Sequence, residues 1–354
     1  MNVMTVIGAR PQFIKAAPVS KALRERGIQE FLLHTGQHYN RNMSQVFFDE
    51  LKIPTPNINL GIKSGSHGQQ TGRMLEAIEQ QILMEKPDIL LVYGDTNSTL
   101  AGALAGAKLK VPVAHVEAGL RSWNREMPEE TNRVLTDHCS NLLFCPTKNA
   151  VENLRKEGIE QNVHLVGDSM FDAMMHFHPM ARENSSILED QNLTDTQFFL
   201  TTLHRPSNVD KLIPLNGILS ALNELPHPVF FPVHPRTQSK LSPDHAKRYP
   251  NILFSGPVGY LDMILLTSSA KAVLTDSGGL QKESYFLETP CITLREETEW
   301  TETLSNGANQ IVGNDPLLIR NAVQNLSEDK ITFDYNHFGR FKASDTISIY
   351  INNS

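Results

Sequence analysis

Short apolar runs alternate with longer segments of helical periodicity along almost the whole chain. In the first half, the apolar runs predict strands at residues 3–7, 30–34, 89–93, 111–115, 141–144 and 163–166. In the second half, they predict strands at residues 198–203, 229–233, 252–254, 272–274, 291–294 and 310–312. Because these strands are apolar throughout and alternate with helical segments, they indicate parallel sheets that helices cover on both faces.

The alternation stops once, in a polar stretch that follows the sequence GDSMFDA. A chain of 354 residues is too long for one ordinary hydrophobic core, so two domains are expected. We therefore predict an α/β protein with two doubly wound, Rossmann-like domains, residues 1–168 and 169–339. A cleft between two such domains is the expected place for a ligand.

Composition and charge exclude several classes of protein. The formal net charge of −7 argues against a nucleic-acid partner, and no apolar run reaches the roughly 18–20 residues that span a bilayer. The first residues pass from a short apolar run into a Gly-Ala-Arg-Pro turn, without the basic segment and cleavage site of a signal peptide. The three cysteines form no CxxC pair. We therefore expect a cytoplasmic protein with no membrane segment, disulfide framework or cysteine zinc site.

Acidic residues follow two predicted strands and begin a predicted helix in the first half of the chain. Asp95 follows the strand at residues 89–93, Glu117 follows the strand at residues 111–115, and Glu129 comes directly after a proline. Carboxylates at the carboxyl ends of parallel strands point into the crevice where α/β proteins bind ligands. For each residue alone, the alternative is a helix cap or a surface ion pair. We predict acid–base chemistry on an anionic substrate, because three basic residues lie nearby: Arg121, Arg125 and Arg133.

Two strand-to-helix turns have the composition of a phosphate-binding site. In GARPQFIK, Arg10 and Lys15 lie near the N-terminus of a predicted helix. In DSGGLQKES, Ser277, Gly278 and Gly279 provide accessible amides and a hydroxyl that suit a diphosphate. The alternative for both is a tight structural turn. Neither turn contains GxGxxG, so we expect no dinucleotide cofactor.

Histidines and amides complete the set of candidate polar residues. His204 ends the first predicted strand of the second half, and the HPRT sequence places His234 and Arg236 at the end of the next strand. His204 can donate to a phosphate or transfer a proton, although a lone histidine is more often structural. In HTGQH, the glycine and the strand end disfavour a helical pair of metal ligands, so we expect no metal. A last set is interpreted either as solvated loop residues or as polar groups of the cleft or hinge: Gln37, His38, Gln69 and Gln70.

Taken together, these motifs resemble one known family. GARPQFIK, TGQH, GDTNSTLAGALA, HVEAGLR, MPEETNR, LHR and DSGG occur in the order and at the spacing of the non-hydrolysing UDP-N-acetylglucosamine 2-epimerases. The resemblance covers nearly the whole chain, and HVEAGLR with the following PEE and NR is highly specific. It implies the GT-B fold, an active site between the domains, a homodimer, and a C-terminal helix, about residues 340–354, that packs back on the first domain.

The resemblance also implies a reaction that supplies precursors of cell-surface polysaccharides. A base removes the C2 proton of UDP-GlcNAc and UDP leaves from C1. The resulting 2-acetamidoglucal takes UDP back while a proton arrives on the other face of C2, which gives UDP-ManNAc without a cofactor. The catalytic residues carried over from the family are Asp95, Glu117, Glu129 and His204. The UDP-sugar-binding residues carried over are Arg10, Lys15, Arg133, His234, Arg236, Tyr260, Ser277, Gly278, Gly279 and Glu283, and Glu283 is expected to hold the ribose.

Three departures from the family pattern bear on the choice of sugar. Gln12 replaces a carboxylate, Trp300 stands where an arginine is typical, and HPRT stands where many members have an HxNP sequence associated with an allosteric UDP-sugar site. These departures resemble a branch that acts on UDP-2,3-diacetamido-2,3-dideoxyglucuronate. Trp300 is expected to change the polarity of the sugar pocket. HPRT weakens the allosteric role that Gln37, Gln69 and Gln70 would inherit.

Three other functions stay compatible with the sequence. A hydrolysing 2-epimerase would release free N-acetylmannosamine and UDP. A GT-B glycosyltransferase would use the same fold and UDP site to transfer the sugar to an acceptor. A UDP-sugar sensor without turnover would not need the carboxylates. Three acids beside the sugar are more than a transferase needs, so epimerisation is the predicted function.

Overall fold

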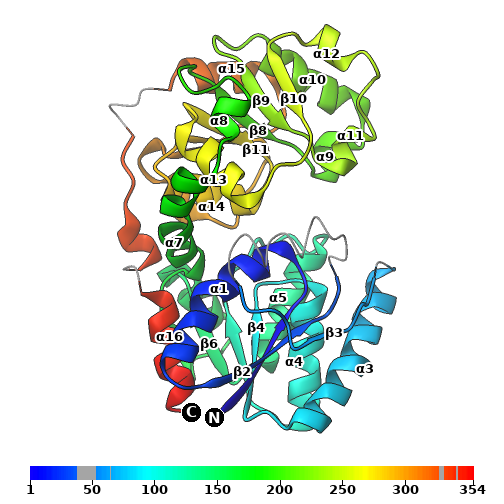
Figure 1. Cartoon of the computed structure of the whole chain (residues 1–354), viewed down its shortest axis with the longest axis vertical. Helices are drawn as coiled ribbons and strands as arrows, with labels where there is room; N and C mark the ends of the chain where they lie inside the picture. Colours follow the sequence, from blue (N-terminus) through cyan, green and yellow to red (C-terminus); the bar gives the residue numbers. More distant parts are fainter. Residues whose placement is uncertain (38–52, 64, 327–330, 340–341) are drawn as a thin grey trace. The chain divides into compact units, whose positions relative to one another are not determined.

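The computed structural model describes residues 1–37, 53–63, 65–326, 331–339 and 342–354, and each of its two compact units holds one sheet (Figure 1). One unit consists of Met1–His176 with Tyr335–Ser354, and the other consists of Phe177–Asp334. The chain therefore passes from the first unit to the second and returns to the first at its C-terminal end.

The first unit is built on a parallel sheet in the order β3-β2-β1-β4-β5-β6-β7. Its strands are β1 (Asn2–Ile7), β2 (Gln29–His34), β3 (Ile58–Asn59), β4 (Ile89–Tyr93), β5 (Val113–Val116), β6 (Leu142–Cys145) and β7 (Val163–Leu165). Each strand predicted for this half is present close to its predicted bounds. Strand β3 was not predicted, because its two residues carry no periodic signal.

The second unit repeats the same strand order in a sheet of β10-β9-β8-β11-β12-β13, again parallel throughout. Its strands are β8 (Phe199–Thr202), β9 (Val229–Pro232), β10 (Ile252–Ser255), β11 (Ala272–Thr275), β12 (Cys291–Thr293) and β13 (Asn309–Ile311). In both sheets, the first strand lies beside the fourth, which is the pattern of a doubly wound fold. The prediction of two parallel α/β sheets is confirmed.

Helices connect the strands of both units. In the first unit they are α1 (Arg10–Glu25), α3 (His67–Glu85), α4 (Asn97–Leu109), α5 (Pro128–Cys139), α6 (Lys148–Lys156) and α16 (Ala343–Asn352), with the short 3-10 helix η3 (Tyr335–Phe338). Helix α7 (Ser169–Asn184) runs across the boundary between the units. In the second unit they are α8 (Ile187–Asp190), α9 (Pro206–Val209), α10 (Leu212–Asn223), α11 (Pro235–Gln238), α12 (His245–Arg248), α13 (Tyr260–Ser269), α14 (Gly278–Phe286), η1 (Thr301–Gly307) and α15 (Pro316–Gln324). Figure 1 shows α1 and α16 on one side of the first sheet and α3 and α4 on the other.

Helix α4 packs unusually close to the first sheet because it contains glycines on its buried side. A Cβ atom at Gly102 would lie 3.0 Å from Cγ1 of Val92, and one at Gly106 would lie 2.6 Å from Cγ2 of Val113. These glycines therefore let the middle and the last part of α4 pack closely on β4 and on the start of β5. Thr96 caps this helix, since its hydroxyl accepts a hydrogen bond from the Thr99 amide at 3.3 Å.

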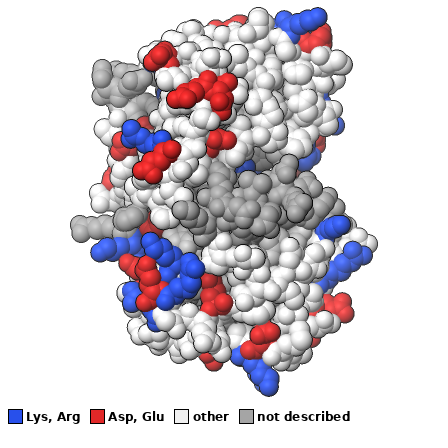
Figure 2. Space-filling model, viewed as in Figure 1, with Lys and Arg blue, Asp and Glu red and all other residues white. Residues whose placement is uncertain are grey.

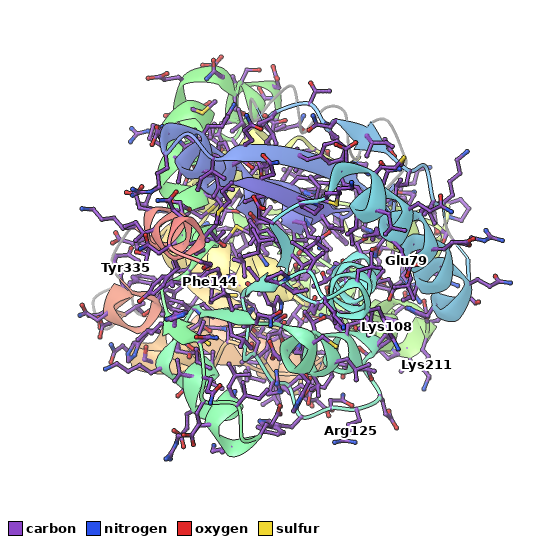
Figure 3. The ribbon with its side chains drawn as sticks, turned by 90° about the horizontal axis from the view of Figure 1, so that it is seen from below. Glu79, Lys108, Arg125, Phe144, Lys211 and Tyr335 are labelled. Carbon is purple, nitrogen blue, oxygen red and sulfur yellow. The ribbon has the colours of Figure 1, made fainter. Side chains whose placement is uncertain are left out.

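Helix α16 packs against α1 at the C-terminal end of the chain. The Arg26 Nε donates to the Ser348 hydroxyl at 2.6 Å, and the Tyr350 ring stacks on His164 with 3.9 Å between ring centroids. The ring of Phe144, which is labelled in Figure 3, also contacts Tyr350, with 6.1 Å between the two ring centroids. The last residues of the chain thus belong to the first unit, although the second unit precedes them.

Among the residues that the structure describes, no helix has both the length and the apolar composition needed to cross a bilayer. Figure 2 shows acidic and basic side chains interspersed on the visible surface of each unit. Such mixed charge differs from the clustered basic face of a nucleic-acid-binding protein.

Candidate active site

The predicted acids of the first unit lie at the switch point of its sheet. Strands β1 and β4 are neighbours, and the chain leaves them in opposite directions toward β2 and β5. Such a point opens a crevice beyond the carboxyl ends of the strands. Arg10 begins α1 directly after β1, and Asp95 follows β4. Glu117 follows β5, the next strand along the sheet.

Asp95 is held by two neighbouring residues of α5. One of its carboxylate oxygens lies 2.5 Å from a terminal nitrogen of Arg133, and its carbonyl accepts a hydrogen bond from the Asn132 amide at 2.9 Å. Desolvation raises the pKa of the Asp95 carboxyl above its ordinary value, and the charge of Arg133 opposes this rise. The negative charges of Glu117 and Glu129 raise the same pKa further. The three predicted acids are therefore electrostatically linked.

Glu117 has a strained backbone and a buried cationic partner. Its φ angle is 74°, in the left-handed region that residues other than glycine seldom adopt. Its carboxylate contacts the Lys15 ammonium, and both side chains are largely buried. Lys15 was predicted to bind a phosphate, whereas in the structure it neutralises Glu117. Strain of this kind costs roughly 1–3 kcal/mol and clusters at functional sites.

The two adjacent glutamates of the PEE sequence have different environments. Glu130 is buried and accepts hydrogen bonds from the Ser122 amide and hydroxyl, both at 2.9 Å, and from the Trp123 amide at 3.0 Å. Glu130 therefore holds the loop that precedes α5. Glu129 is half-buried, and its charge acts on Asp95. Of the two, Glu129 is the one with a carboxylate available for chemistry.

The prediction that three arginines face an anionic substrate is wrong for Arg121. This side chain is buried and donates to Asp137 at 2.7 Å and to both carboxylate oxygens of Glu157 at 2.7 Å. Arg125, labelled in Figure 3, is exposed on the loop that precedes α5. Only Arg133 of the three contacts a predicted acid within the described part of the chain.

The predicted glutamine cluster forms hydrogen bonds within the first unit. The Gln37 side-chain oxygen accepts from the Ser98 hydroxyl at 2.7 Å, and the Gln70 oxygen accepts from the Asn97 amide at 2.9 Å. Gln69 is exposed in the first turn of α3. His38 lies outside the described residues. In the structure, Gln70 thus joins α3 to the start of α4, and Gln37 joins the chain after β2 to the same helix start.

Gln12, the first departure from the family pattern, has all four of its hydrogen-bonding positions satisfied. Its oxygen accepts from the Gly8 and Ala9 amides at 2.8 and 3.0 Å. Its nitrogen donates to the Tyr93 carbonyl and to the Thr99 hydroxyl, both at 2.9 Å. The amide therefore joins the start of α1 to the end of β4, which a carboxylate could not do because it cannot donate.

The second unit places its predicted residues at the equivalent switch point, between β8 and β11. His204 follows β8, and its Nδ1 lies 3.1 Å from a carboxylate oxygen of Asp276, which follows β11. The Asp276 carboxylate also accepts from the Arg205 amide at 3.0 Å and the Asn208 side chain at 3.1 Å. Although burial opposes it, the contact with His204 holds the pKa of Asp276 below its ordinary value. Asp276 was not predicted as a site residue, although its position directly after a predicted strand marks it as a candidate.

His204 and His234 lie close together, with 5.5 Å between ring centroids. The two sequence motifs LHR and HPRT therefore meet, because β8 and β9 are neighbours in the sheet. Arg236 is directed elsewhere: its Nε lies 3.0 Å and one of its terminal nitrogens 2.7 Å from the two carboxylate oxygens of Asp210. A cavity of about 440 Å³ opens beside this motif and is lined by Val233, Pro235, Gln238, Ser239, Gly256 and Pro257.

The predicted diphosphate cradle lies at the start of α14 and has one unexpected neighbour. Ser277 caps the helix, and a Cβ atom at Gly279 would approach nothing closer than the Ser277 hydroxyl, at 3.9 Å. A Cβ atom at Gly278 would lie 2.2 Å from a carboxylate oxygen of Glu299. That carboxylate also lies 3.1 Å from Arg295. Gly279 therefore leaves room for a ligand, whereas the space beside Gly278 is filled by Glu299.

Tyr260 of α13 and Glu283 of α14, which were both predicted to bind the UDP-sugar, contact each other. The Tyr260 hydroxyl donates to a carboxylate oxygen of Glu283 at 3.1 Å. Tyr260 is buried and Glu283 is half-buried, so the tyrosine orients the carboxylate.

Trp300, which was assigned to the sugar pocket, packs against a lysine in the structure. Its side chain is buried, and the Lys282 ammonium lies 3.7 Å from the ring centroid. Lys282 is buried as well. The tryptophan therefore serves as the partner of a buried cation through a cation–π contact.

Within the described ranges, no group of three or more histidine, cysteine or carboxylate side chains could hold a metal ion. The residues that gather are instead suited to proton transfer and anion binding. The first unit presents linked carboxylates with one raised pKa, and the second presents a histidine, a helix N-terminus and a tyrosine-held glutamate.

Comparison with known proteins identifies the family of the chain. The chain matches the family model described as UDP-N-acetylglucosamine 2-epimerase over residues 21–352. The UDP-N-acetylglucosamine 2-epimerase homolog of Methanococcus maripaludis is 51% identical over 349 residues, which are 97% of each chain. The UDP-2,3-diacetamido-2,3-dideoxy-D-glucuronate 2-epimerase of Pseudomonas aeruginosa is 47% identical over 358 residues, which cover 99% of each chain.

A solved structure is similar over the full length. The crystal structure of the Methanocaldococcus jannaschii UDP-GlcNAc 2-epimerase in complex with UDP-GlcNAc and UDP aligns with a TM-score of 0.90 at 42% identity and covers 100% of both chains. This likeness confirms the predicted GT-B-like fold with two Rossmann-like domains.

Proposed function

The chain belongs to the UDP-N-acetylglucosamine 2-epimerase family, and we propose that it interconverts UDP-GlcNAc and UDP-ManNAc without hydrolysing the nucleotide. The family is one of isomerases. One observation carries the mechanism: Glu117 reaches the loop of Asp95, since a Cβ atom at Gly94 would lie 3.3 Å from an oxygen of the Glu117 carboxylate. Inversion at a single carbon needs proton transfer on both of its faces. Neighbouring carboxylates can serve as the proton-transfer groups for the two faces.

The proposed reaction begins at C2, whose proton is only weakly acidic. One carboxylate removes this proton, the C2–H electrons form a double bond to C1, and the C1–O bond breaks with its electron pair leaving on UDP. UDP then adds back to C1 of the 2-acetamidoglucal while a proton reaches the opposite face of C2. The raised pKa of Asp95 suits a group that must both accept and return a proton. We assign the proton transfers to Asp95, Glu117 and Glu129.

The proposed role of the second unit is to bind UDP and to stabilise its departure. The leaving diphosphate gains negative charge, which the amides at the start of α14 and the His204 imidazole are suited to neutralise. Arg10, at the start of α1, is assigned to the same charge. Glu283, oriented by Tyr260, is assigned to the ribose hydroxyls.

A neutral acetamido sugar is favoured over the diacetamido uronate as substrate. The uronate carries a carboxylate of its own and would need a cation in the sugar pocket. Three predicted cations already have a carboxylate partner: Lys15, Arg133 and Arg236. So does Arg295, whose partner Glu299 lies beside Gly278. The relative that acts on the uronate is 47% identical, so this substrate is the second candidate.

Proton NMR of UDP-GlcNAc incubated with the enzyme in D2O tests the proposal. We expect deuterium at C2 of the remaining substrate and of UDP-ManNAc, because the proton is removed and returned in both directions. Free N-acetylmannosamine with UDP would identify a hydrolysing epimerase, and transfer to an acceptor without an epimer would identify a glycosyltransferase. If no acetamido UDP-sugar exchanged its C2 proton, the proposal would fail.

A parallel assay with UDP-GlcNAc and the diacetamido uronate decides the sugar, which we expect to be UDP-GlcNAc. The homodimer and the cytoplasmic location stay predictions. Sedimentation tests the first and is expected to give twice the chain mass of 39.6 kDa.

A further inference from the structure

A buried pair of side chains connects the two loops that carry Asp95 and Glu117. His115 lies within β5, and its side chain and that of Asp137 in α5 are both 0% exposed. The His115 Nδ1 lies 2.7 Å from one carboxylate oxygen of Asp137, and its Nε2 lies 2.7 Å from the Gly94 carbonyl. Gly94 is the residue directly before Asp95, so the imidazole reaches the backbone of the first loop.

The same aspartate also reaches the second loop. The other carboxylate oxygen of Asp137 accepts a hydrogen bond from the Gly119 amide at 3.1 Å and from Arg121 at 2.7 Å. Gly119 follows Glu117 by two residues. One carboxylate therefore links the turn after β4, through His115, with the turn after β5.

The partners of the imidazole determine where its protons lie. The Gly94 carbonyl can only accept a hydrogen bond, so the His115 Nε2 must carry a proton. The other carboxylate oxygen of Asp137 already accepts from Arg121 and from the Gly119 amide, so Asp137 is the acceptor in its contact with Nδ1. The Nδ1 atom then donates to a carboxylate, and both ring nitrogens act as donors.

The loop after β5 needs such support because its backbone is strained at Glu117. Gly94, Glu117 and Gly119 have φ angles of 62°, 74° and 80°, all in the left-handed region. Glu117 is not a glycine, so it keeps this conformation only where surrounding contacts hold it. The acid side chains in turn depend on these angles for their direction.

We propose that His115 and Asp137 are positioning residues, which hold the Gly94 carbonyl and the Gly119 amide and thereby set Asp95 and Glu117 as one unit. The inference rests on the proposed function, since it concerns the geometry of proton transfer at C2. His115 is fully buried and touches no substrate, so it acts through the two loops. A misplacement of about 1 Å at such a site can cost on the order of 100-fold in rate.

Two matched substitutions separate the two hydrogen bonds of the imidazole. In His115→Gln, the amide nitrogen occupies about the position of Nε2 and keeps the donation to Gly94. In His115→Asn, the amide nitrogen occupies about the position of Nδ1 and keeps only the contact with Asp137. We expect His115→Asn to lose about 100-fold in kcat, and His115→Gln to stay within about tenfold of the wild type, with KM little changed in both.

Each variant loses one buried hydrogen bond, so thermal unfolding should report similar stability losses. A purely structural role would give equal kcat losses that follow the unfolding temperature, and this result would overturn the proposal. Asp137→Asn provides a rescue, because the asparagine amide can donate to a neutral Nδ1 while Nε2 keeps its proton. We expect Asp137→Asn to retain kcat within about tenfold and Asp137→Ala to lose about 100-fold.

Nitrogen-15 NMR of histidine-labelled wild-type protein supplies a readout that does not depend on activity. We expect the His115 resonance, assigned by its loss in His115→Gln, to show protons on both ring nitrogens. A ring without a proton on Nε2 would overturn the inference. If the wild type instead shows this ring but no C2 exchange, the proposed function fails while the hydrogen-bonded link stands.

Discussion

At the scale of single residues, the site of the first unit is a set of matched opposite charges. Arg133 lies against Asp95 and Lys15 lies against Glu117, and each contact joins residues that are far apart in the sequence. Desolvation raises the pKa of Asp95, and the charge of Arg133 opposes this rise. The acid–base behaviour of the site therefore depends on the cations as much as on the acids.

The pH dependence of the reaction should respond to Arg133. Its positive charge lowers the pKa of Asp95, so Arg133→Gln should raise that pKa and move the acidic limb of kcat/KM to higher pH. A pH profile of kcat/KM measures this shift. Arg125→Gln removes an exposed arginine of the same region and should leave the limb unchanged. A limb that moved to lower pH in Arg133→Gln would contradict the assignment.

The two glycines of the proposed diphosphate cradle should differ in their effects. Gly279→Ala adds a methyl group where nothing lies closer than 3.9 Å, so the fold should persist while UDP affinity falls about tenfold or more. Gly278→Ala should also lower the unfolding temperature, because its methyl group would displace the Glu299 carboxylate. Calorimetric binding and thermal unfolding measure the two effects. Wild-type UDP affinity in Gly279→Ala would remove this helix start from the binding site.

At the scale of elements, polar side chains join each switch point across the sheet. Gln12 connects the start of α1 with the end of β4 in the first unit. Asp276 connects the loop after β8 with the loop after β11 in the second. In each unit, the residue lies where two neighbouring strands end and where the backbone groups of the two following turns need hydrogen-bond partners.

Replacing the amide of Gln12 should weaken the joint between α1 and β4. A glutamate cannot donate to the Tyr93 carbonyl or the Thr99 hydroxyl and would bury a charge, so Gln12→Glu should lower stability by about 1–3 kcal/mol. Denaturant unfolding measures the loss. The matched control is Gln69→Glu, which changes an exposed residue and should cost little. Equal stability of both variants would contradict the role of the buried amide.

A positive charge at position 300 should destabilise the protein, because Trp300 contacts the buried Lys282 ammonium. Trp300→Arg would place a guanidinium beside a buried ammonium, and we expect a loss of about 3 kcal/mol or more. Adding Lys282→Glu should restore part of this stability, because the two charges would then be opposite. Thermal unfolding of both variants measures the effect. No recovery in the double variant would show that packing, rather than charge, decides this contact.

At the scale of the whole molecule, the two units repeat one topology and carry different chemistry. The first holds the linked acids and the second holds the helix start, the histidine pair and the ribose-binding candidate. Because function resides in sites rather than in the fold, the same strand order serves two tasks.

Binding and catalysis should therefore be separable by unit. Asp95→Asn should lower the rate of C2 exchange by about 100-fold or more and leave UDP affinity nearly unchanged. Gly279→Ala should do the reverse, and the free-energy effects should add in the double variant. Exchange NMR and calorimetry measure the two quantities. If Asp95→Asn weakened UDP binding as strongly as it slowed exchange, the division of tasks would be wrong.

Most of the architecture follows from local features of the chain. Strands buried on both faces must be apolar throughout, so β1, β4 and β11 appear in the sequence as short apolar runs. Because parallel strands share one carboxyl edge, the polar residues that follow these runs, such as Asp95 and His204, could be predicted as site residues. The order of the motifs likewise indicated the family.

Only the tertiary structure decided which of these residues are partners. Asp95 pairs with Arg133 across 38 positions and Lys15 with Glu117 across 102, and periodicity carries no information on such contacts. Likewise, only the fold shows that Arg121 packs against Asp137 and Trp300 against Lys282. The sequence by itself determined which residues stand at the strand ends. Sheet order and packing determined which of them face a ligand and which hold the loops, because both depend on strands distant in the sequence lying side by side.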